Sequence, residues 1–168
     1  STRVLTLFPY TTLFRSMVSE YVEKFYIPAN KKGAHFENDN YAIARNVAAW
    51  KTKIRKVWDH VSLRRLDTPT RQINFGDLLD FKVAVNLNGL QPEDVVVELL
   101  LCRQYKKMRL TNFKHFKFDC VGIVSPQEHL FELKHAPELC GRQEYYLRIY
   151  PFHPALTHPL EMGMTIWL

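Results

Sequence analysis

The segment FKVAVNLNGLQPEDVVVELLLC, residues 81–102, carries the clearest fold signal in the sequence. In residues 81–87 apolar side chains alternate with polar or small ones, which is the pattern of a strand with one buried face. A turn is predicted next, because Asn, Gly and Pro favour turns and occur at Asn88, Gly89 and Pro92. Residues 95–102 are almost entirely apolar, as in a strand at the centre of a sheet. The segment therefore predicts two strands joined by a turn.

Further strands are predicted on both sides of this segment, with turn residues between them and no intervening helix, for a total of about seven. This pattern predicts an immunoglobulin-like antiparallel β-sandwich over residues 61–168, without the Cys–Trp–Cys signature of antibody domains. With two helices before it, the fold class is α+β. The other predicted strands are residues 61–66, 118–124, 129–134, 144–150 and 162–168.

A helical connector is predicted over residues 17–60, and its first helix is short. Four apolar residues between Val18 and Phe25 lie at helical spacing, with charged residues on the other face. We expect this helix to end near Pro28 and residues 30–33, Asn-Lys-Lys-Gly, to form a hinge.

The second predicted helix runs from about residue 37 to about residue 59, with Asn38 or Asp39 as its N-cap. Its apolar residues repeat at steps of four and three. Because these helices have few partners nearby in the sequence, we expect them to dock on a preceding domain. The repeating residues are Ile43, Val47, Trp50, Ile54 and Val57.

Residues 1–16, STRVLTLFPYTTLFRS, are expected to be non-native. They show no helical period, and Pro9 interrupts the apolar run that a signal peptide needs. Residues 7–16 resemble the in-frame translation of a sequencing-library adapter. We therefore expect the native part to begin near Met17 and to be the C-terminal piece of a longer protein.

Composition and charge exclude several classes of protein. The chain has 168 residues, of which 46% are hydrophobic and 13% aromatic, and this excludes a disordered tail, a collagen-like chain and a small disulfide scaffold. A formal charge of +6 is a feature of proteins that bind nucleic acid, so a nucleic-acid partner has to be considered. Without Arg3 and Arg15 it falls to +4, and residues 62–168 carry 13 basic against 12 acidic residues. This balance predicts no nucleic-acid partner.

Residues 103–117 form a basic stretch with interleaved aromatic residues. Tyr105, Phe113 and Phe116 could stack on bases while the cations contact phosphates. The stretch also lies between two predicted strands, so the alternative to a nucleic-acid site is a solvated loop that connects them. We favour the loop.

The cysteine and histidine patterns predict no metal or redox site. Cys102, Cys120 and Cys140 are widely spaced and are expected to be reduced thiols. His153 and His158 could form a metal or proton site, but we expect both side chains to bond the backbone of a proline-containing loop.

No catalytic or cofactor-binding residue is predicted either. The sequence has no glycine-rich phosphate loop and no GxSxG motif. The carboxylates of Glu93 and Asp94 fall in a turn and are expected to be solvated. From the residues alone, the chain is a helical connector followed by an accessory β-domain.

Several segments resemble the bacterial α-glucan phosphorylases, the glycogen and maltodextrin phosphorylase family. The resemblance covers essentially all of residues 17–168, and its segments occur in the order that the family has them. Residues 103–116 depart from the family pattern. The segments are residues 17–29, 48–51 with Trp58, 75–77, 87–95, 146–154, 159–163 and 166–168.

The resemblance implies that the whole protein transfers a glucosyl unit from an α-1,4-glucan to orthophosphate and releases glucose 1-phosphate. It also implies pyridoxal phosphate as cofactor in an upstream catalytic core, and a cytoplasmic protein without a membrane segment. No segment here matches the lysine motif that holds this cofactor. We therefore expect the fragment alone to be non-catalytic, with no catalytic, cofactor-binding or metal residue and no bound cofactor, and to have the upstream core as its partner.

Two roles for the β-domain remain open. One is structural support of the catalytic core, with the helices of residues 17–59 as the clasp, and we favour it. The alternative is a stand-alone carbohydrate-binding module, in which exposed aromatic residues stack on sugar rings. Tyr146 and Tyr150 are the candidates because they fall on one strand face, although the alternation says only that one of the two faces is buried.

Overall fold

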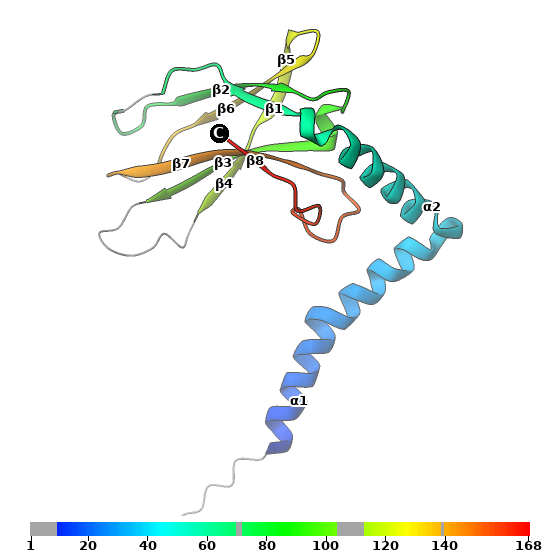
Figure 1. The fold of residues 1–168 in the computed structure, drawn as a ribbon. Coiled ribbons are helices and arrows are strands. Elements are labelled where there is room, and N and C mark those ends of the chain that lie inside the picture. The colour runs from blue at the N-terminus through cyan, green and yellow to red at the C-terminus, as the bar shows by residue number, and fades with distance from the viewer. Residues whose placement is uncertain (1–9, 70–71, 104–112, 139) are drawn as a thin grey trace, which may run out of the picture. The chain divides into compact units, whose positions relative to one another are not determined.

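A computed structural model of the chain describes residues 10–69, 72–103, 113–138 and 140–168. The contacts divide the chain after Asn46 into an N-terminal helical unit and a second unit, Val47–Leu168. Figure 1 shows the helices and the labelled strands. Within the described residues no helix is long and apolar enough to cross a membrane.

The first N-terminal helix runs further than predicted. Helix α1 spans Tyr10–Tyr21, a π-helical turn η1 spans Val22–Tyr26, and α2 spans Ile27–Val57. The prediction that the first helix ends near Pro28 was therefore wrong. The widened π-turn, in which the Ile27 amide donates to the Val22 carbonyl, lies directly before the proline, where a regular α-turn would press the ring against a carbonyl.

The hinge lies later in the chain than residues 30–33, which are helical. The backbone leaves helical geometry at Asn38, and Asp39, Asn40 and Tyr41 have φ values of 53°, 51° and 60°. Asn and Asp tolerate this left-handed region better than most residues. The break therefore falls at the position where the sequence placed the start of the second helix, and not at the predicted glycine-containing hinge.

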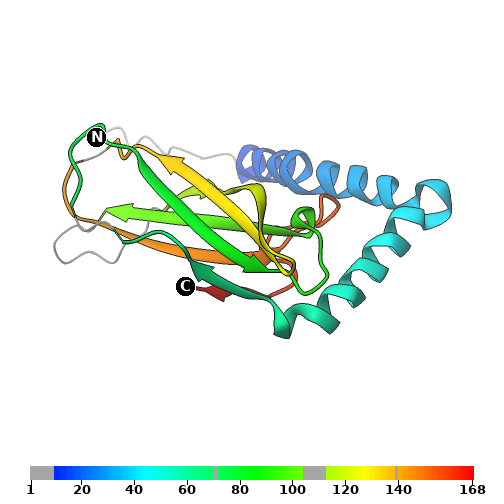
Figure 2. The ribbon, with the colours of Figure 1, turned by 90° about the horizontal axis from the view of Figure 1, so that it is seen from above.

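The second unit is a sandwich of two four-stranded antiparallel sheets, in the orders β1-β2-β6-β5 and β4-β3-β7-β8. This is the strand order of a constant-type immunoglobulin sandwich with one added strand, β4, so the predicted fold class is confirmed. Figure 2 shows the long strands of one sheet crossing those of the other obliquely, as in aligned sandwiches. The strands are β1 Ser62–Arg65, β2 Leu79–Asn86, β3 Val95–Arg103, β4 Lys114–Lys117, β5 Asp119–Ser125, β6 Glu128–His135, β7 Gln143–Pro151 and β8 Ile166–Trp167.

Strand β4 was not predicted, because Lys114–Lys117 lies in the basic stretch that was interpreted as a connection. Its residues pair with β3, with Lys117 opposite Glu98 and Lys114 opposite Leu101. Three of its four residues are Lys or His, so an edge strand of this composition carries little hydrophobic signal. Residues 104–112 of the predicted connection lie outside the described residues.

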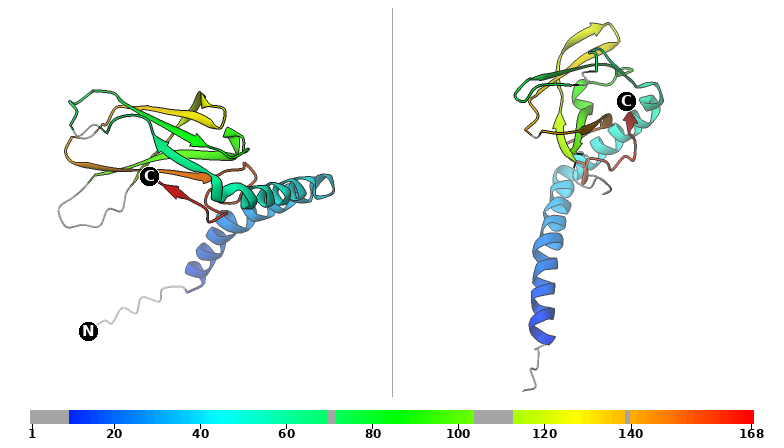
Figure 3. Two further views of the ribbon diagram at one scale, coloured as in Figure 1. Left: turned by 45° about the horizontal axis from the view of Figure 1, so that its top comes forward. Right: turned by 90° about the vertical axis from the view of Figure 1, so that its left-hand side faces the viewer.

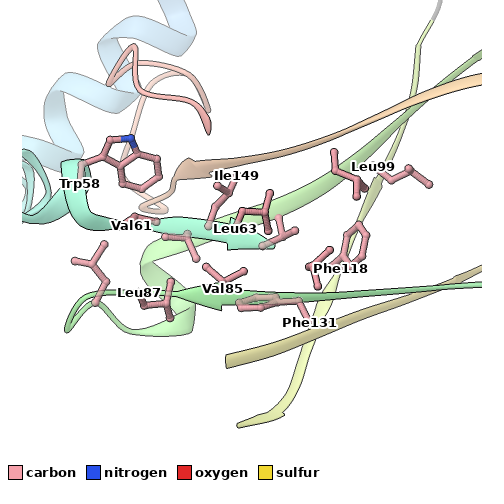
Figure 4. Close-up of a cluster of buried hydrophobic side chains, with 14 of the residues drawn as sticks. Trp58, Val61, Leu63, Val85, Leu87, Leu99, Phe118, Phe131 and Ile149 are labelled. Carbon is pink, nitrogen blue, oxygen red and sulfur yellow. The ribbon is translucent and has the colours of Figure 1, made fainter. Parts of the chain in front are cut away.

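The core lies between the sheets and extends into the last turns of α2. Figure 4 shows a row of apolar side chains from Trp58 through Val85 and Ile149 to Phe118. Trp50, Ile54 and Trp58 belong to the same buried cluster as the strand residues. These side chains therefore pack on the β-sandwich that follows them, whereas the sequence analysis expected them to dock on a preceding domain.

Asp94 fastens the end of α2 to the sandwich. It closes the short 3₁₀ turn η3, Pro92–Asp94, before β3. Its Oδ1 accepts a hydrogen bond of 2.7 Å from Trp50 Nε1, and its Oδ2 accepts one of 3.0 Å from the Gln91 amide. The prediction that Asp94 is merely solvated was wrong, because the carboxylate is the hydrogen-bond partner that a buried indole requires.

The fully buried Ile54 tests whether α2 is part of the folded unit. Ile54→Ala should lower the free energy of unfolding by about 2–5 kcal/mol, because it leaves a cavity between helix and sheets. Urea unfolding followed by circular dichroism measures this change. Ile27→Ala, an exposed position of the same helix, is the matched control and should change stability by less than about 0.5 kcal/mol. Equal small effects of both substitutions would contradict the packing described.

Candidate functional site

The outward face of the sheet β4-β3-β7-β8 carries the aromatic residues that the sequence analysis considered for sugar stacking. On β7, Leu147 and Ile149 point into the core and are buried, so Tyr146, Arg148 and Tyr150 lie on the opposite face. The structure thereby decides which of the two alternating sets is buried.

The predicted pair of Tyr146 and Tyr150 does not form a platform. Tyr146 is 42% exposed, but Tyr150 is only 4% exposed. The guanidinium of Arg148 lies 5.3 Å from the centroid of the Tyr150 ring, and burial raises the pKa of the Tyr150 hydroxyl. Neighbouring side chains therefore cover Tyr150, and only Tyr146 of the predicted pair is accessible to a sugar ring.

A buried ionic cluster forms the floor of this face. Glu98 on β3 is 4% exposed, and its Oε2 accepts a hydrogen bond of 2.7 Å from Arg148 Nε and forms an ion pair with Arg148 Nη2 at 2.6 Å. Its Oε1 lies 2.9 Å from His115 Nδ1 on β4. Both carboxylate oxygens are therefore partnered, which a buried carboxylate requires. Sequence reasoning missed this cluster, although Glu98 is the one charge in the apolar run 95–102.

Trp167 on β8 supplies the exposed aromatic surface that Tyr150 does not. It is 54% exposed, and its ring centroid lies 6.5 Å from that of Tyr146, with the planes at 89°. The ring of Phe113 lies 6.1 Å from Tyr146 on the other side, at 68°. We call Phe113, Tyr146 and Trp167 the aromatic strip. Figure 3 shows β8, the red arrow at the C-terminus, and β8 pairs with β7 so that Trp167 lies opposite Arg148.

A cavity of about 520 Å³ lies elsewhere on the sandwich, where Arg65, Asp67, Phe81 and Tyr145 contribute to its wall. Asp67 Oδ2 accepts from Arg65 Nε at 2.9 Å, and Asp67 Oδ1 accepts from the Lys82 amide at 3.0 Å. Arg65 Nη1 also donates to the Tyr145 hydroxyl at 2.5 Å. These groups satisfy one another and tie the chain after β1 to β2 and β7, so the ion pair is structural.

The Arg65–Asp67 pair shifts the pKa of both groups. Burial alone would raise the pKa of the Asp67 carboxyl, but the hydrogen bonds from Arg65 and from the Lys82 amide outweigh burial and lower it. Burial likewise opposes the charge of Arg65, yet its bonds to Asp67 and Tyr145 raise the pKa of the guanidinium. Both groups are therefore held in their charged forms.

His153 and His158 bond backbone amides, as the sequence predicted, and the three cysteines are free thiols. His153 Nδ1 accepts from the Ala155 amide and His158 Nδ1 from the Leu160 amide, each at 3.1 Å. Cys102 is buried, which raises the pKa of its thiol, while Cys120 and Cys140 are exposed free thiols. Among the described residues no three His, Cys, Asp or Glu side chains gather as a metal site would require.

Comparison with known proteins identifies relatives over most of the chain. Residues 58–168 match the family described as glycogen phosphorylase C-terminal domain. The chain is 30% identical over 169 aligned residues to the maltodextrin phosphorylase of Thermococcus litoralis, covering 90% of this chain and 18% of that protein. It is 26% identical over 151 residues to the glycogen phosphorylase of Mycobacterium tuberculosis, covering 88% of this chain and 17% of the relative.

The chain therefore spans less than a fifth of the length of these curated relatives. No solved structure matches it.

Asp67→Asn tests the structural role of the Arg65–Asp67 pair. At pH 7 it should lower the free energy of unfolding by about 1–3 kcal/mol, because the partly buried guanidinium loses its charged partner. The pKa of Asp67 is lowered on folding, so its contribution is full above the ordinary carboxyl pKa of about 4 and is lost as the pH falls through the folded value. The difference between the two proteins should therefore shrink below about pH 4 in urea titrations.

Asp80→Asn is the matched control for this titration, since its exposed carboxylate lies 3.4 Å from Lys82. It should change stability by less than about 0.5 kcal/mol at any pH. A loss for Asp67→Asn that is no larger than the control's, or that grows as the pH is lowered, would argue against the pair as a structural tie.

Proposed function

This chain belongs to the family of glycogen phosphorylase C-terminal domains, and on that premise we propose that it is the accessory C-terminal part of an α-glucan phosphorylase. The whole enzyme of this proposal transfers a glucosyl unit from the non-reducing end of an α-1,4-glucan to orthophosphate, with pyridoxal phosphate as its cofactor, in the cytoplasm. The fragment itself supports an upstream catalytic core and does no chemistry.

The residues that the structure describes do not fit pyridoxal phosphate. A Schiff base to this cofactor needs a lysine enclosed in a pocket. No lysine of the described residues is buried, and several are paired with carboxylates at the surface. The one buried charged side chain among the described residues is Glu98, which is held by Arg148 and His115. The lysine pairs are Lys51 with Glu161, Lys82 with Glu132 and Lys114 with Glu138.

The main evidence for this supporting role is an exposed apolar stripe on the N-terminal helices. Val18, Tyr21, Val22 and Phe25 are all exposed, and the rings of Tyr21 and Phe25 lie 5.6 Å apart on one side of the helix. None of residues 16–46 is buried. A contiguous apolar stripe of this kind marks a surface that another body covers, and in a phosphorylase the catalytic core is that body.

The absence of catalysis is tested on the purified chain. Incubated with maltoheptaose, orthophosphate and pyridoxal phosphate, it should form no glucose 1-phosphate in a coupled phosphoglucomutase assay. It should also show no stoichiometric Schiff-base absorbance, because no described lysine is enclosed. Either product formation or a one-to-one aldimine spectrum would show that the chain holds catalytic groups of its own.

The docking role is tested in a maltodextrin phosphorylase whose own C-terminal segment is replaced by residues 17–168. This chimera should form glucose 1-phosphate. Tyr21→Glu with Phe25→Glu should reduce its activity about tenfold or more, because two carboxylates would be buried against the core without partners.

Lys24→Glu, which places one carboxylate on the polar side of the same turn, is the matched control and should leave activity within about twofold. An inactive chimera, or a double variant with undiminished activity, would count against docking through this stripe.

A further inference from the structure

We propose that the aromatic strip of Phe113, Tyr146 and Trp167 binds the chain of an α-1,4-glucan, with the Glu98–Arg148–His115 cluster as its floor. This inference rests on the proposed function, since that function supplies the substrate class. It keeps Tyr146 from the predicted pair of Tyr146 and Tyr150, and adds Phe113 and Trp167 in place of Tyr150, which is covered.

The arrangement of the rings suits a curved chain. Sugar rings present C–H groups that stack on the faces of aromatic side chains, and Tyr adds a hydroxyl that can hydrogen-bond. Coplanar rings suit the flat ribbon of a β-1,4-glucan, whereas rings at steep angles follow the curve that an α-1,4 linkage imposes. In the strip the successive ring planes are inclined by 68° and 89°, with centroids 6.1 and 6.5 Å apart.

The charge of the floor suits a neutral ligand. Glu98 and Arg148 neutralise each other through a hydrogen bond of 2.7 Å and an ion-pair contact of 2.6 Å, so this pair offers no free cation to a phosphate. His115 is held by Glu98 through Nδ1 while 49% of its side chain stays exposed, so its other edge can hydrogen-bond a sugar hydroxyl. A surface of aromatic rings and paired charges matches a neutral polyol better than a nucleic acid or an anionic membrane.

Trp167 is also held in place in the absence of a ligand. The guanidinium of Arg148 lies 5.3 Å from the Tyr150 ring and 5.4 Å from the Trp167 ring. Backbone pairing fixes β8, and the Leu168 amide donates to the Leu147 carbonyl at 3.0 Å. Little side-chain freedom is then lost on binding, which favours affinity from a small contact area.

The strip contains its own spectroscopic reporter. The chain has three tryptophans, and Trp50 and Trp58 are buried, so only Trp167 is open to an aqueous quencher. Maltoheptaose should shift the emission to shorter wavelength and protect it from iodide quenching, with saturation. Cellohexaose, a flat β-1,4 chain, should do neither at the same concentration. No protection by maltoheptaose, or equal protection by both sugars, would overturn the proposal.

Affinity electrophoresis in glycogen-containing gels tests the residues. The unmodified chain should be retarded, and Tyr146→Ala and Trp167→Ala should each weaken the apparent affinity about tenfold or more. Phe75→Ala is the matched control, because Phe75 is an aromatic residue that is 75% exposed outside the strip, and it should be retarded as the unmodified chain is. Circular dichroism confirms that each variant is folded. Equal retardation of all variants would overturn the assignment of the strip.

The chimeric phosphorylase separates this proposal from the docking role. If the chain docks but glycogen does not retard it, the strip proposal fails and the accessory function stands. If Trp167→Ala lowers the activity of the chimera on short maltodextrins while the isolated chain shows no glucan binding, the strip packs against protein and the proposal is wrong. If glycogen retards the chain but the chimera is inactive, the docking role fails and the binding site stands.

Discussion

Two facing sheets exclude water only if the space between their ends is closed as well, and in this protein the last turns of α2 close it. Trp50, Ile54 and Trp58 enter the same buried cluster as the strand residues. Fully burying side chains of this size contributes roughly 1.5–3 kcal/mol each. The indole of Trp50 could not be buried without an acceptor, and Asp94 supplies one at the start of β3. The end of α2 and the turn η3 before β3 are therefore parts of one core.

The second organising interaction is the buried carboxylate of Glu98. It lies on the outward face of its sheet, yet it is covered, because Arg148 and His115 close over it from the strands on either side. A buried charge that lost one of these partners would be strongly destabilising, so the cluster keeps β4, β3 and β7 in register at this level. Arg148 also positions the rings of Tyr150 and Trp167. The same cation that stabilises the sheet therefore arranges the aromatic surface.

The two proposed roles use different parts of the chain. The apolar stripe of the N-terminal helices serves attachment, and the aromatic strip lies on the sheet that ends the chain. A β-domain with a neutral, aromatic outward face suits a polymer substrate, because a polymer extends well beyond any single site and can be held at a second point on the same protein. Such bivalent attachment raises the local concentration of substrate without any new chemistry in the accessory domain.

Hydrophobic periodicity alone determined that residues 61–168 form an antiparallel β-sandwich, since the buried face of each strand leaves a period-two record in the sequence. The sequence also placed the start of the second helix near Asn38, where the backbone breaks, although it predicted the hinge itself at residues 30–33. His153 and His158 bond backbone amides as predicted from their proline-containing loop. Strand β4 was not predicted, because a lysine-rich edge strand buries few side chains and therefore shows no period-two pattern of apolar residues. The burial of Tyr150, the exposure of Trp167 and the partners of Glu98 were decided only by tertiary structure. Each depends on which strand lies next to which, and local periodicity does not encode the order of strands in a sheet.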